Sequence, residues 1–365
     1  MRIVVKLGTS SLTNGTKHIS PPFIIELARQ VAELKQKNHQ VVIVTSGAIA
    51  AGREKLNFPQ LPKNMPAKQM LAAIGQLSLM ALYEQIFSLY GMLVAQVLLT
   101  RADLSDRRRY LNARNTLVAM MMENLVAIIN ENDTVATEEI RVGDNDNLSA
   151  LVANLIDADL LILLTDLAGL YTADPRSDPN AEFVKTVTGD EIPEALWQAA
   201  GGSKSGLGTG GMTTKLQAAD LARHSGTACV IANSKEPNIL IRLANDEKIG
   251  TYFPALVNAI ESRKRFIMSA RRAPGQITVD NGAVLALKRG GSLLPIGIVQ
   301  LTGKFERGDT IRILDENNHE IARGITNYPH ADLLQIIRRR SDEIETLLGY
   351  TYGDEVVHRN DLVLL

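Results

Sequence analysis

The sequence has a single cysteine in 365 residues, which excludes an internal disulfide and any metal cluster built on cysteine ligands. This residue, Cys229, lies in the apolar run Ala228–Ile231, where a buried structural thiol is expected rather than a nucleophile. No apolar run approaches the length of about 20 residues that a membrane span needs. The segment Met1–Lys6 enters a strand-like run without a signal-peptide pattern. We therefore expect a cytoplasmic protein without a membrane segment.

The sequence also lacks an excess of charge of either sign. Its 39 Lys and Arg residues stand against 40 Asp and Glu residues, a net charge of −1. Proteins that bind a nucleic-acid backbone normally carry a strong basic excess, so the overall charge gives that function no support. Hydrophobic residues make up 45% and charged residues 22%, which excludes a disordered chain. The length predicts two domains of roughly 100–200 residues each.

Residues 1–260 alternate short β-rich runs with segments of helical period. The expected strands, several of them apolar almost throughout, are Ile3–Val5, Val41–Thr45, Leu93–Leu99, Val126–Ile129, Leu160–Thr165 and Ala228–Ala232. The expected helices are Phe23–Lys37, Lys68–Tyr90, Tyr110–Glu123, Leu148–Leu155 and Thr213–His224. This alternation predicts an α/β domain with a mostly parallel sheet sandwiched by helices. Ligands of such sheets bind at the carboxyl ends of the strands.

The character of the chain changes near Gln276. We expect a linker over residues 261–275, because Glu261–Pro274 carries five basic residues and one acidic residue. Such a segment is typical of a solvated connection, the alternative being a partner-binding patch. From Gln276 onward, short strands alternate with turn signals such as Asp280-Asn281-Gly282. Residues 276–365 are therefore expected to form a second, small β-rich domain.

Two loops that follow expected strands are suited to anions. The first reads Lys6-Leu7-Gly8-Thr9-Ser10-Ser11, where backbone N–H groups and small hydroxyl side chains can meet an anion. The Lys6 ammonium could lie over the same anion or, taken alone, could leave the sheet into solvent. The second loop, Ser46-Gly47-Ala48, turns from a strand into a helix whose N-terminus suits phosphate or carboxylate.

A polar stretch follows the expected strand Val126–Ile129. It reads Asn130-Glu131-Asn132-Asp133 and continues with Gly143-Asp144-Asn145-Asp146-Asn147. Unpaired buried charges are costly, so this density of carboxylates and amides favours a binding role over a structural one. These groups suit an amino group, a magnesium ion or the orientation of catalytic lysines. An EF-hand is excluded, because the spaced ligands and terminal Glu of its 12-residue loop are missing.

The segment Ser205–Lys215 is rich in glycine, and Gly206, Gly208 and Gly211 satisfy the G-x-G-x-x-G spacing. A dinucleotide site is excluded, because no strand precedes these glycines and no acidic residue lies about 20 positions later at the end of a second strand. A Walker A loop is excluded because Lys215 follows threonine rather than glycine. We expect a loop that closes over a nucleotide phosphate and brings Lys215 onto the transferring group, the alternative being a surface linker.

Two lysines, glycine-rich anion loops and an acidic cluster together predict phosphoryl transfer. That reaction requires in-line positioning of the reactants and neutralisation of charge on the moving phosphoryl group.

Taken together, the loops described above and the segments that flank them resemble those of the glutamate 5-kinases. The bacterial form of these enzymes joins the amino acid kinase fold to a C-terminal PUA domain. The resemblance covers essentially the whole chain, without departure from the family pattern in these loops. It rests on Val4–Ser10, Val44–Ala48, Asn130–Asp133, Val142–Ala150, Leu164–Asp166, Gly169–Tyr171 and Gly208–Lys215. Two of these strings, Gly143–Ala150 and Gly208–Lys215, are long enough to separate it from kinases of aspartate, carbamate, uridylate or acetylglutamate.

The resemblance implies that ATP phosphorylates the side-chain carboxylate of L-glutamate, the first step of proline synthesis, with Mg²⁺. It implies that Lys6 and Lys215 stabilise the transferring phosphoryl group, with Lys6 also touching ATP. Glutamate would be bound by Ser46, Asn130, Asp133 and Asn145. The nucleotide would be bound by Thr165, Asp166, Thr209, Gly210, Gly211, Met212, Thr213, Thr214 and Lys215. Asp144 and Asp146 either orient the lysines or hold Mg²⁺, and the sequence does not separate these roles.

A carboxylate acceptor agrees with the residues, because a carboxylate is already a nucleophile at neutral pH and needs no activated His or Cys. The resemblance further implies inhibition by L-proline, a homo-oligomer, and a functional link to glutamyl phosphate reductase.

Two alternatives stay open from the sequence. The first is another amino acid kinase, such as one for acetylglutamate, although Asp133 suits a free α-ammonium that an acetylated substrate lacks. The second is an RNA-binding protein, because PUA domains elsewhere bind RNA. Against it, residues 276–365 carry 10 Lys and Arg residues and 13 Asp and Glu residues, a net charge of −3.

Overall fold

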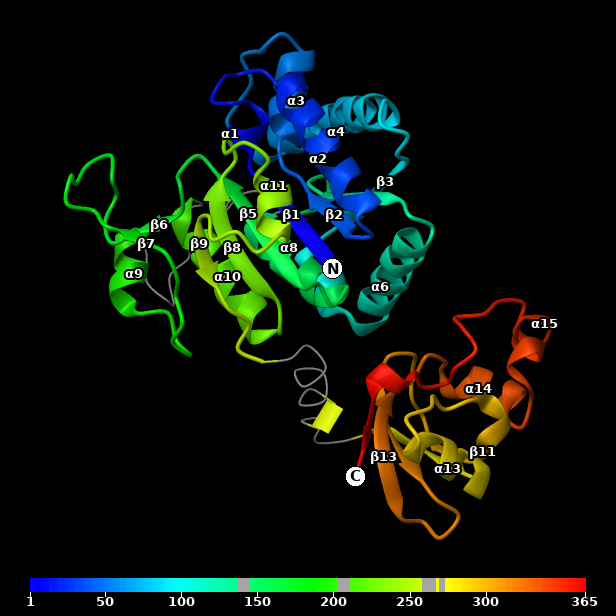
Figure 1. Cartoon of the computed structure of the whole chain (residues 1–365). Helices are drawn as coiled ribbons and strands as arrows, with labels where there is room; N and C mark the ends of the chain where they lie inside the picture. The colour runs from blue at the N-terminus through cyan, green and yellow to red at the C-terminus, as the bar shows by residue number, and fades with distance from the viewer. Residues whose placement is uncertain (137–144, 202–210, 258–266, 269–272) are drawn as a thin grey trace. The chain divides into compact units, whose positions relative to one another are not determined.

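The computed structural model describes residues 1–136, 145–201, 211–257, 267–268 and 273–365. The chain divides into two compact units, one of residues 1–104 with 112–258 and one of residues 105–111 with 259–365. Figure 1 shows the chain coloured from its N-terminus to its C-terminus. Each unit has its own sheet and its own hydrophobic core.

The first unit is built on a seven-stranded sheet in the order β3-β4-β2-β1-β5-β8-β9. Neighbouring strands are parallel, except that β8 and β9 are antiparallel. The central strands are almost entirely buried and mostly apolar, since helices cover both faces of the sheet. The strands are β1 (Arg2–Leu7), β2 (Gln40–Val44), β3 (Val94–Leu99), β4 (Val126–Glu131), β5 (Leu160–Thr165), β8 (Ala228–Asn233) and β9 (Thr251–Phe253). A separate hairpin pairs β6 (Leu170–Tyr171) with β7 (Phe183–Val184).

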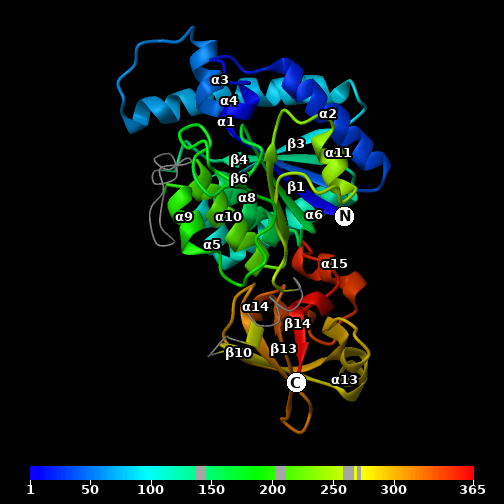
Figure 2. The same cartoon turned by 60° about the vertical axis from the view of Figure 1, so that its left-hand side comes forward.

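Helices cover both faces of this sheet. Figure 2 shows α2, α4 and α11 on one face and α8 and α10 on the other. The helices of this unit are α1 (Thr9–Leu12), α2 (Pro21–Gln36), α3 (Ala48–Lys55), α4 (Met65–Ser88), α5 (Arg101–Ser105), α8 (Asn145–Leu155), α9 (Glu194–Ala199), α10 (Met212–His224) and α11 (Ile239–Ala244). Helix α6 (Arg107–Met122) begins in the segment that clusters with the second unit.

The central strand β1 directs its side chains alternately to the two faces, as the strand period requires. Ile3, Val5 and Leu7 pack into the core formed with α2 and α4. The intervening residues, Val4 and Lys6, therefore face the opposite side, where α8 and α10 lie. This alternation brings one lysine into an otherwise apolar strand and aims it between two helices.

Helices α3 and α4 are held together by two glycines. A Cβ atom on Gly75 would lie 1.8 Å from the carbonyl oxygen of Ala48, and one on Gly52 would lie 2.0 Å from the carbonyl oxygen of Leu71. Only glycine fits at either position, because both contacts are with backbone atoms. The two helix backbones therefore touch directly.

Helix α4 is long and apolar enough to cross a membrane by length and composition alone, with a mean hydropathy of 1.3 in its most apolar window. Its packing indicates a core helix instead, since Leu79, Tyr83 and Phe87 are buried in the main core. The Tyr83 hydroxyl also lies 3.0 Å from Oγ1 of Thr45, just after β2.

The second unit contains a five-stranded sheet in the order β11-β10-β12-β13-β14. Its strands are β10 (Gly275–Val279), β11 (Ile298–Gly303), β12 (Thr310–Leu314), β13 (Glu320–Ile325) and β14 (Leu362–Leu364). Only β10 and β12 are parallel, and the other described pairs are antiparallel. Helices α13 (Asn281–Lys288), α14 (His330–Ile336) and α15 (Ile344–Leu348) complete it.

The predicted α/β fold with a mostly parallel sheet, followed by a β-rich unit, is confirmed. The turn expected at Asp280-Asn281-Gly282 is wrong: α13 begins there, because the Asp280 carboxylate accepts a hydrogen bond from the Ala283 N–H at 2.8 Å and caps the helix. Asn145–Asn147 form the first turn of α8 rather than a loop. Most of the basic segment Glu261–Pro274 lies outside the described residues.

Candidate active site

A cavity of about 670 Å³ opens at the carboxyl ends of β1, β2, β4 and β5, the edge where parallel sheets bind ligands. It brings together residues from all four segments that the sequence analysis selected. The predicted residues that line it are Lys6, Ser46, Asn130, Asp133, Asn145, Asp146, Thr165, Asp166, Gly211, Met212 and Lys215.

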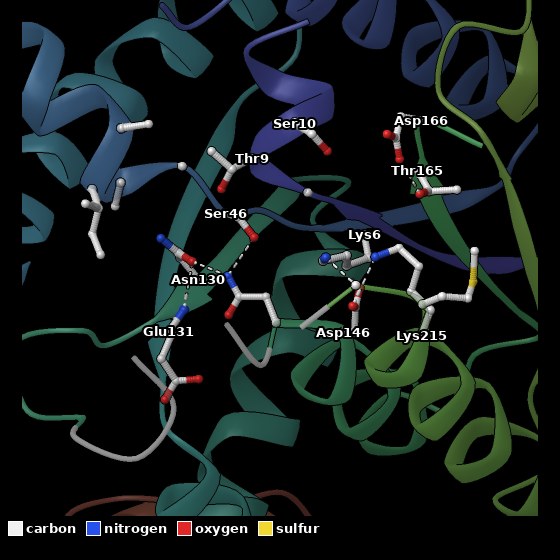
Figure 3. A pocket seen from close by; sticks show the side chains of 18 of the residues that line it. Lys6, Thr9, Ser10, Ser46, Asn130, Glu131, Asp146, Thr165, Asp166 and Lys215 are labelled. Atoms are coloured by element: carbon white, nitrogen blue, oxygen red, sulfur yellow. Dashed lines mark hydrogen bonds and ion pairs between the residues drawn. The ribbon is translucent and has the colours of Figure 1, made fainter. Parts of the chain in front are cut away.

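Asp146 joins the two lysines of this cavity. Its Oδ1 lies 2.6 Å from Nζ of Lys6, and its Oδ2 lies 3.2 Å from Nζ of Lys215. The Thr214 hydroxyl donates to the same Oδ2 at 2.7 Å. Figure 3 shows the two ammonium groups meeting at this carboxylate. The side chains are 5% (Lys6), 11% (Lys215) and 3% (Asp146) exposed, so the cluster is shielded from water.

The charges of this cluster do not cancel. Burial alone disfavours the ionised form of Asp146, but Lys6, Lys215 and the hydrogen bonds to the carboxylate outweigh it and lower its pKa to about 2. One carboxylate therefore faces two ammonium groups at neutral pH. The surplus positive charge, held at the edge of a cavity, is suited to an anionic ligand.

The sequence places these groups at the first turns of two helices. Asp146 is the second residue of α8, where the helix dipole favours a carboxylate. Helix α10 follows Gly211, whose φ of +90° lies in the left-handed region that favours glycine, so that Lys215 falls in its first turn. A cation is disfavoured at a helix N-terminus. Asp146 offsets that penalty across the gap between the helices.

The wall next to Ser46 is built from neutral amides. Nδ2 of Asn145 donates to the carbonyl of Thr45 at 2.7 Å, to Oγ of Ser46 at 3.0 Å and to Oδ1 of Asn130 at 2.9 Å. Asn130 is buried at the end of β4. Figure 3 shows Ser46 and Asn130 on one side of the cavity and the lysines on the other.

Asp133 also lines the cavity and is partly buried. Its burial raises the pKa of the carboxyl group to about 6. No ion pair holds Asp133 within the part of the chain that the structure describes. A carboxylate in this situation gains by binding a cation, so it is suited to an ammonium group on a ligand.

Thr165 ends β5 and Asp166 follows it, and both line the same cavity, with the Thr165 hydroxyl donating to the Asp166 carboxylate at 3.1 Å. Thr213 and Thr214 differ from the other predicted residues. Their hydroxyls donate within the protein, to the carbonyl of Ala200 at 2.7 Å and to Asp146 respectively, and neither residue lines the cavity. The predicted residues Asp144, Thr209 and Gly210 lie outside the described residues.

Five polar lining residues were not assigned to the site from the sequence: Thr9, Ser10, Glu131, Arg53 and Arg176. The first three lie in segments that the sequence predicts to bind a ligand, so the sequence indicated the segment but not these individual residues. Arg53 comes from the last turn of α3, and Arg176 follows β6 and is held by Asp174 at 3.0 Å. No local pattern points to either arginine.

The cavity thus has two chemically different walls. The wall with Lys6 and Lys215 suits a polyanion such as a nucleotide phosphate. The wall with Asn145, Ser46 and Asp133 offers hydrogen-bonding groups and a carboxylate to a small polar molecule with an ammonium group. Such a site can hold an anionic donor beside an amino acid.

Comparison with known proteins gives matches over both units. Residues 1–233 match the amino acid kinase family, and residues 275–348 match the PUA domain. The chain is 54% identical to the glutamate 5-kinase of Shewanella oneidensis, over all of this chain and 98% of that protein. It is 54% identical to the glutamate 5-kinase of Escherichia fergusonii over 99% of this chain and 98% of that protein. It is 51% identical to the glutamate 5-kinase of Vibrio vulnificus, over 100% of this chain and 96% of that protein.

Substitution of Asp146 should show how far the lysine pair depends on it. Asp146→Asn keeps the size of the side chain but leaves two buried ammonium groups without their anion, so the free energy of unfolding should fall by about 3–5 kcal/mol. The measurement is urea unfolding at pH 7. The exposed neighbour Asp166 provides a control, since Asp166→Asn should change stability by less than about 0.5 kcal/mol.

The pH dependence gives a second check on the same variant. The folded pKa of Asp146 lies below its ordinary value of 3.8, so its stabilisation is complete above about pH 4 and is lost only as the pH falls through about 2. The stability difference between the wild type and Asp146→Asn should therefore be constant from pH 5 to 8. A difference that disappears within that range would show that the carboxylate is not held ionised by the lysines.

Proposed function

The chain belongs to the amino acid kinase family, in its glutamate 5-kinase branch, and we propose that it transfers the γ-phosphoryl group of ATP to the side-chain carboxylate of L-glutamate. The product is L-glutamyl 5-phosphate, and the reaction is the first step of proline biosynthesis. The observation that carries the proposal is the buried cluster of Lys6, Asp146 and Lys215, which presents surplus positive charge beside a wall suited to an amino acid.

The phosphoryl transfer needs no proton transfer to begin. One oxygen of the glutamate side chain forms a bond to the γ-phosphorus as the bond from that phosphorus to the β,γ-bridging oxygen breaks, and the electron pair leaves on ADP. Lys6 and Lys215 neutralise charge on the γ-phosphoryl oxygens during this step. Asp146 holds both ammonium groups in place, so that little reorganisation is required when the phosphate arrives.

The amide wall binds the acceptor. Asp133 pairs with the α-ammonium of glutamate, while Ser46, Asn130 and Asn145 supply and orient hydrogen bonds around it. An acetylated glutamate has no ammonium group to offer Asp133, which favours free glutamate over its N-acetyl derivative. Thr165, Asp166, Gly211 and Met212 line the part of the cavity that would receive the nucleotide.

The donor set fits a magnesium ion that arrives on the nucleotide rather than a resident metal. The described part of the chain holds no group of three or more His, Cys, Asp or Glu side chains that could hold a metal ion. Both carboxylate oxygens of Asp146 already meet lysines, which leaves Asp144 as the candidate carboxylate. Magnesium commonly takes one or two carboxylates together with substrate phosphates, and it would supply charge neutralisation on those phosphates.

Finer features follow from the resemblance and are proposed on that basis. The chain would act in the cytoplasm, as a homo-oligomer, and pass its reactive acyl phosphate to glutamyl phosphate reductase. Every candidate site residue precedes Leu216, so we assign the chemistry to residues 1–260 and none of it to residues 276–365. The connection over 261–275 then separates the two domains.

The direct test is an assay with ATP and L-glutamate in which hydroxylamine traps the acyl phosphate. Hydroxamate should form with L-glutamate and should not form with N-acetyl-L-glutamate at the same concentration. Product from the acetylated substrate alone would replace the proposal with its closest rival.

Lys215→Ala should lower kcat on the order of 10²–10³-fold, because this ammonium acts mainly on the charge that develops in the transition state. The KM for glutamate should change far less. Lys185→Ala, an exposed lysine of the same unit, is the control and should leave both constants unchanged. Turnover within about threefold of the wild type would remove Lys215 from the mechanism.

Glutamate use should depend on the ionisation of Asp133. Because its pKa is raised to about 6, the carboxylate needed for the α-ammonium is lost as the pH falls through that value. The kcat/KM for glutamate should fall about tenfold per pH unit below 6, while that for ATP falls less. Asp133→Asn should have a steeply raised KM for glutamate without this pH dependence. A wild-type profile that stays flat from pH 5 to 7 would contradict this role.

L-Proline should inhibit in competition with glutamate. It keeps the α-carboxylate and a cationic amine, so it can use part of the same wall, but it has no side-chain carboxylate to receive a phosphoryl group. Raising the glutamate concentration at fixed proline should restore the full rate. Inhibition that no amount of glutamate relieves would point to a separate proline site.

A further inference from the structure

We propose that Gln76, on α4, is a positioning residue that fixes the orientation of the amides facing the acceptor and so determines which atom of Asn145 meets the ligand. This inference rests on the proposed function and deepens it. Gln76 lies outside the set of cavity-lining residues and reaches the site only through Asn130, to which it is hydrogen-bonded at 2.8 Å.

Hydrogen bonds connect Thr45, Asn145, Asn130 and Gln76 in that order, which we call the amide chain. It starts at a group that can act only as an acceptor. The backbone carbonyl of Thr45 can only accept a hydrogen bond, so Asn145 must turn its Nδ2 toward it, at 2.7 Å. The same Nδ2 lies 2.9 Å from Asn130, which must then present its oxygen rather than its amide nitrogen. The backbone N–H of Glu131 donates to that oxygen as well, at 2.9 Å. Two donors therefore fix the orientation of Asn130.

This orientation leaves the other end of the Asn130 amide to be satisfied. Asn130 is 1% exposed, so water does not serve its Nδ2. Oε1 of Gln76 accepts from this Nδ2 at 2.8 Å and closes the chain. Nε2 of Gln76 is itself buried and has no hydrogen-bond partner in the described part of the protein. Turning the Gln76 amide around would set two N–H₂ groups against each other, so its oxygen must face Asn130.

The fixed orientation of these amides determines which atom of Asn145 is available to a ligand. With Nδ2 committed to Thr45, Ser46 and Asn130, Asn145 has its carbonyl oxygen left for the cavity. An oxygen accepts, so this position takes an N–H donor such as the α-ammonium of glutamate, beside Asp133. If Asn130 lost its acceptor at Gln76, rotation of its amide would relieve the unpaired Nδ2 and break the contact that holds Asn145. Gln76 thus acts on glutamate through two intervening side chains.

Two substitutions at this position separate positioning from packing. Gln76→Met keeps the length and volume of the side chain but removes the acceptor, whereas Gln76→Glu keeps an acceptor oxygen and introduces a buried charge. Positioning predicts that Gln76→Met raises the KM for glutamate at least tenfold, with the KM for ATP within twofold of the wild type. It predicts that Gln76→Glu stays within about threefold for both. A packing role predicts the opposite order, because methionine fits an apolar surrounding better than a carboxylate.

The exposed Gln85 of the same helix is the matched control, and Gln85→Met should leave both constants unchanged. Thermal unfolding of each variant checks that it is folded. If Gln76→Met does not fold, Gln76→Glu still decides: a tenfold rise in its KM for glutamate overturns the inference, and a value near the wild type supports it. Equal KM values for Gln76→Met and the wild type also overturn it.

Calorimetric titration with L-glutamate, without nucleotide, separates this inference from the proposed function. Wild-type protein that binds glutamate but forms no product refutes the phosphoryl transfer and leaves the positioning role to be read from the dissociation constants, which should follow the same order as the KM values. Wild-type protein that does not bind glutamate refutes both.

Discussion

The contact between Asp146 and two lysines is the constraint on which the rest of the first unit depends. Lys6 belongs to the central strand, Asp146 to the start of α8 and Lys215 to the start of α10. Three elements far apart in the sequence are thus tied at one buried point. An ion pair in such a place is stable only when every partner is present, since a single uncompensated charge in the interior is far more costly than the pair. The fold and the charge of the site are therefore decided by the same interaction.

The two walls of the cavity solve different electrostatic problems. In the proposed reaction, the lysine wall must attract a polyanion yet remain folded without one, and Asp146 provides the counter-charge in its absence. The opposite wall has to orient an acceptor that carries charges of its own. Asn130 and Asn145 direct hydrogen bonds without adding net charge next to the lysines, and the Asp133 carboxylate, which forms no ion pair in the described part of the chain, is suited to an ammonium group.

The alternation of strands and helices was readable from the sequence because buried parallel strands are continuous apolar runs and the helices between them keep a period of 3.6. The strands predicted at Val126–Ile129 and Leu160–Thr165 appear as β4 and β5. The start of α8 was not predicted, because Asn145-Asp146-Asn147 is a poor helix sequence that becomes helical where Asp146 finds its lysines. The helix after Asp280 was missed for a related reason: a turn signal and an N-cap use the same residues.

For the site, the sequence predicted which loops contribute residues, but it did not predict which side chains contact one another. Lys6 and Lys215 lie in segments that the sequence predicts to bind anions. Their common contact with Asp146 depends instead on how β1, α8 and α10 pack. Gln76 and Arg53 lie within ordinary helical segments, without any local pattern that marks them. Residues of this kind become visible only when hydrogen bonds and the cavity itself are known, because their relevance comes from tertiary proximity.

The glycine contact between α3 and α4 has a consequence for how this enzyme could change its substrate. Gly75 precedes Gln76 directly, and α3 follows Ser46 by two residues, so the backbone contact at Gly52 and Gly75 sets the separation between the two ends of the amide chain. At these two positions no side chain separates the helices, so there is none whose size could change to widen or narrow the spacing there. Evolution toward a longer or shorter acceptor would therefore have to exchange the side chains that line the cavity, while the spacing of α3 and α4 at the two glycines stays the same.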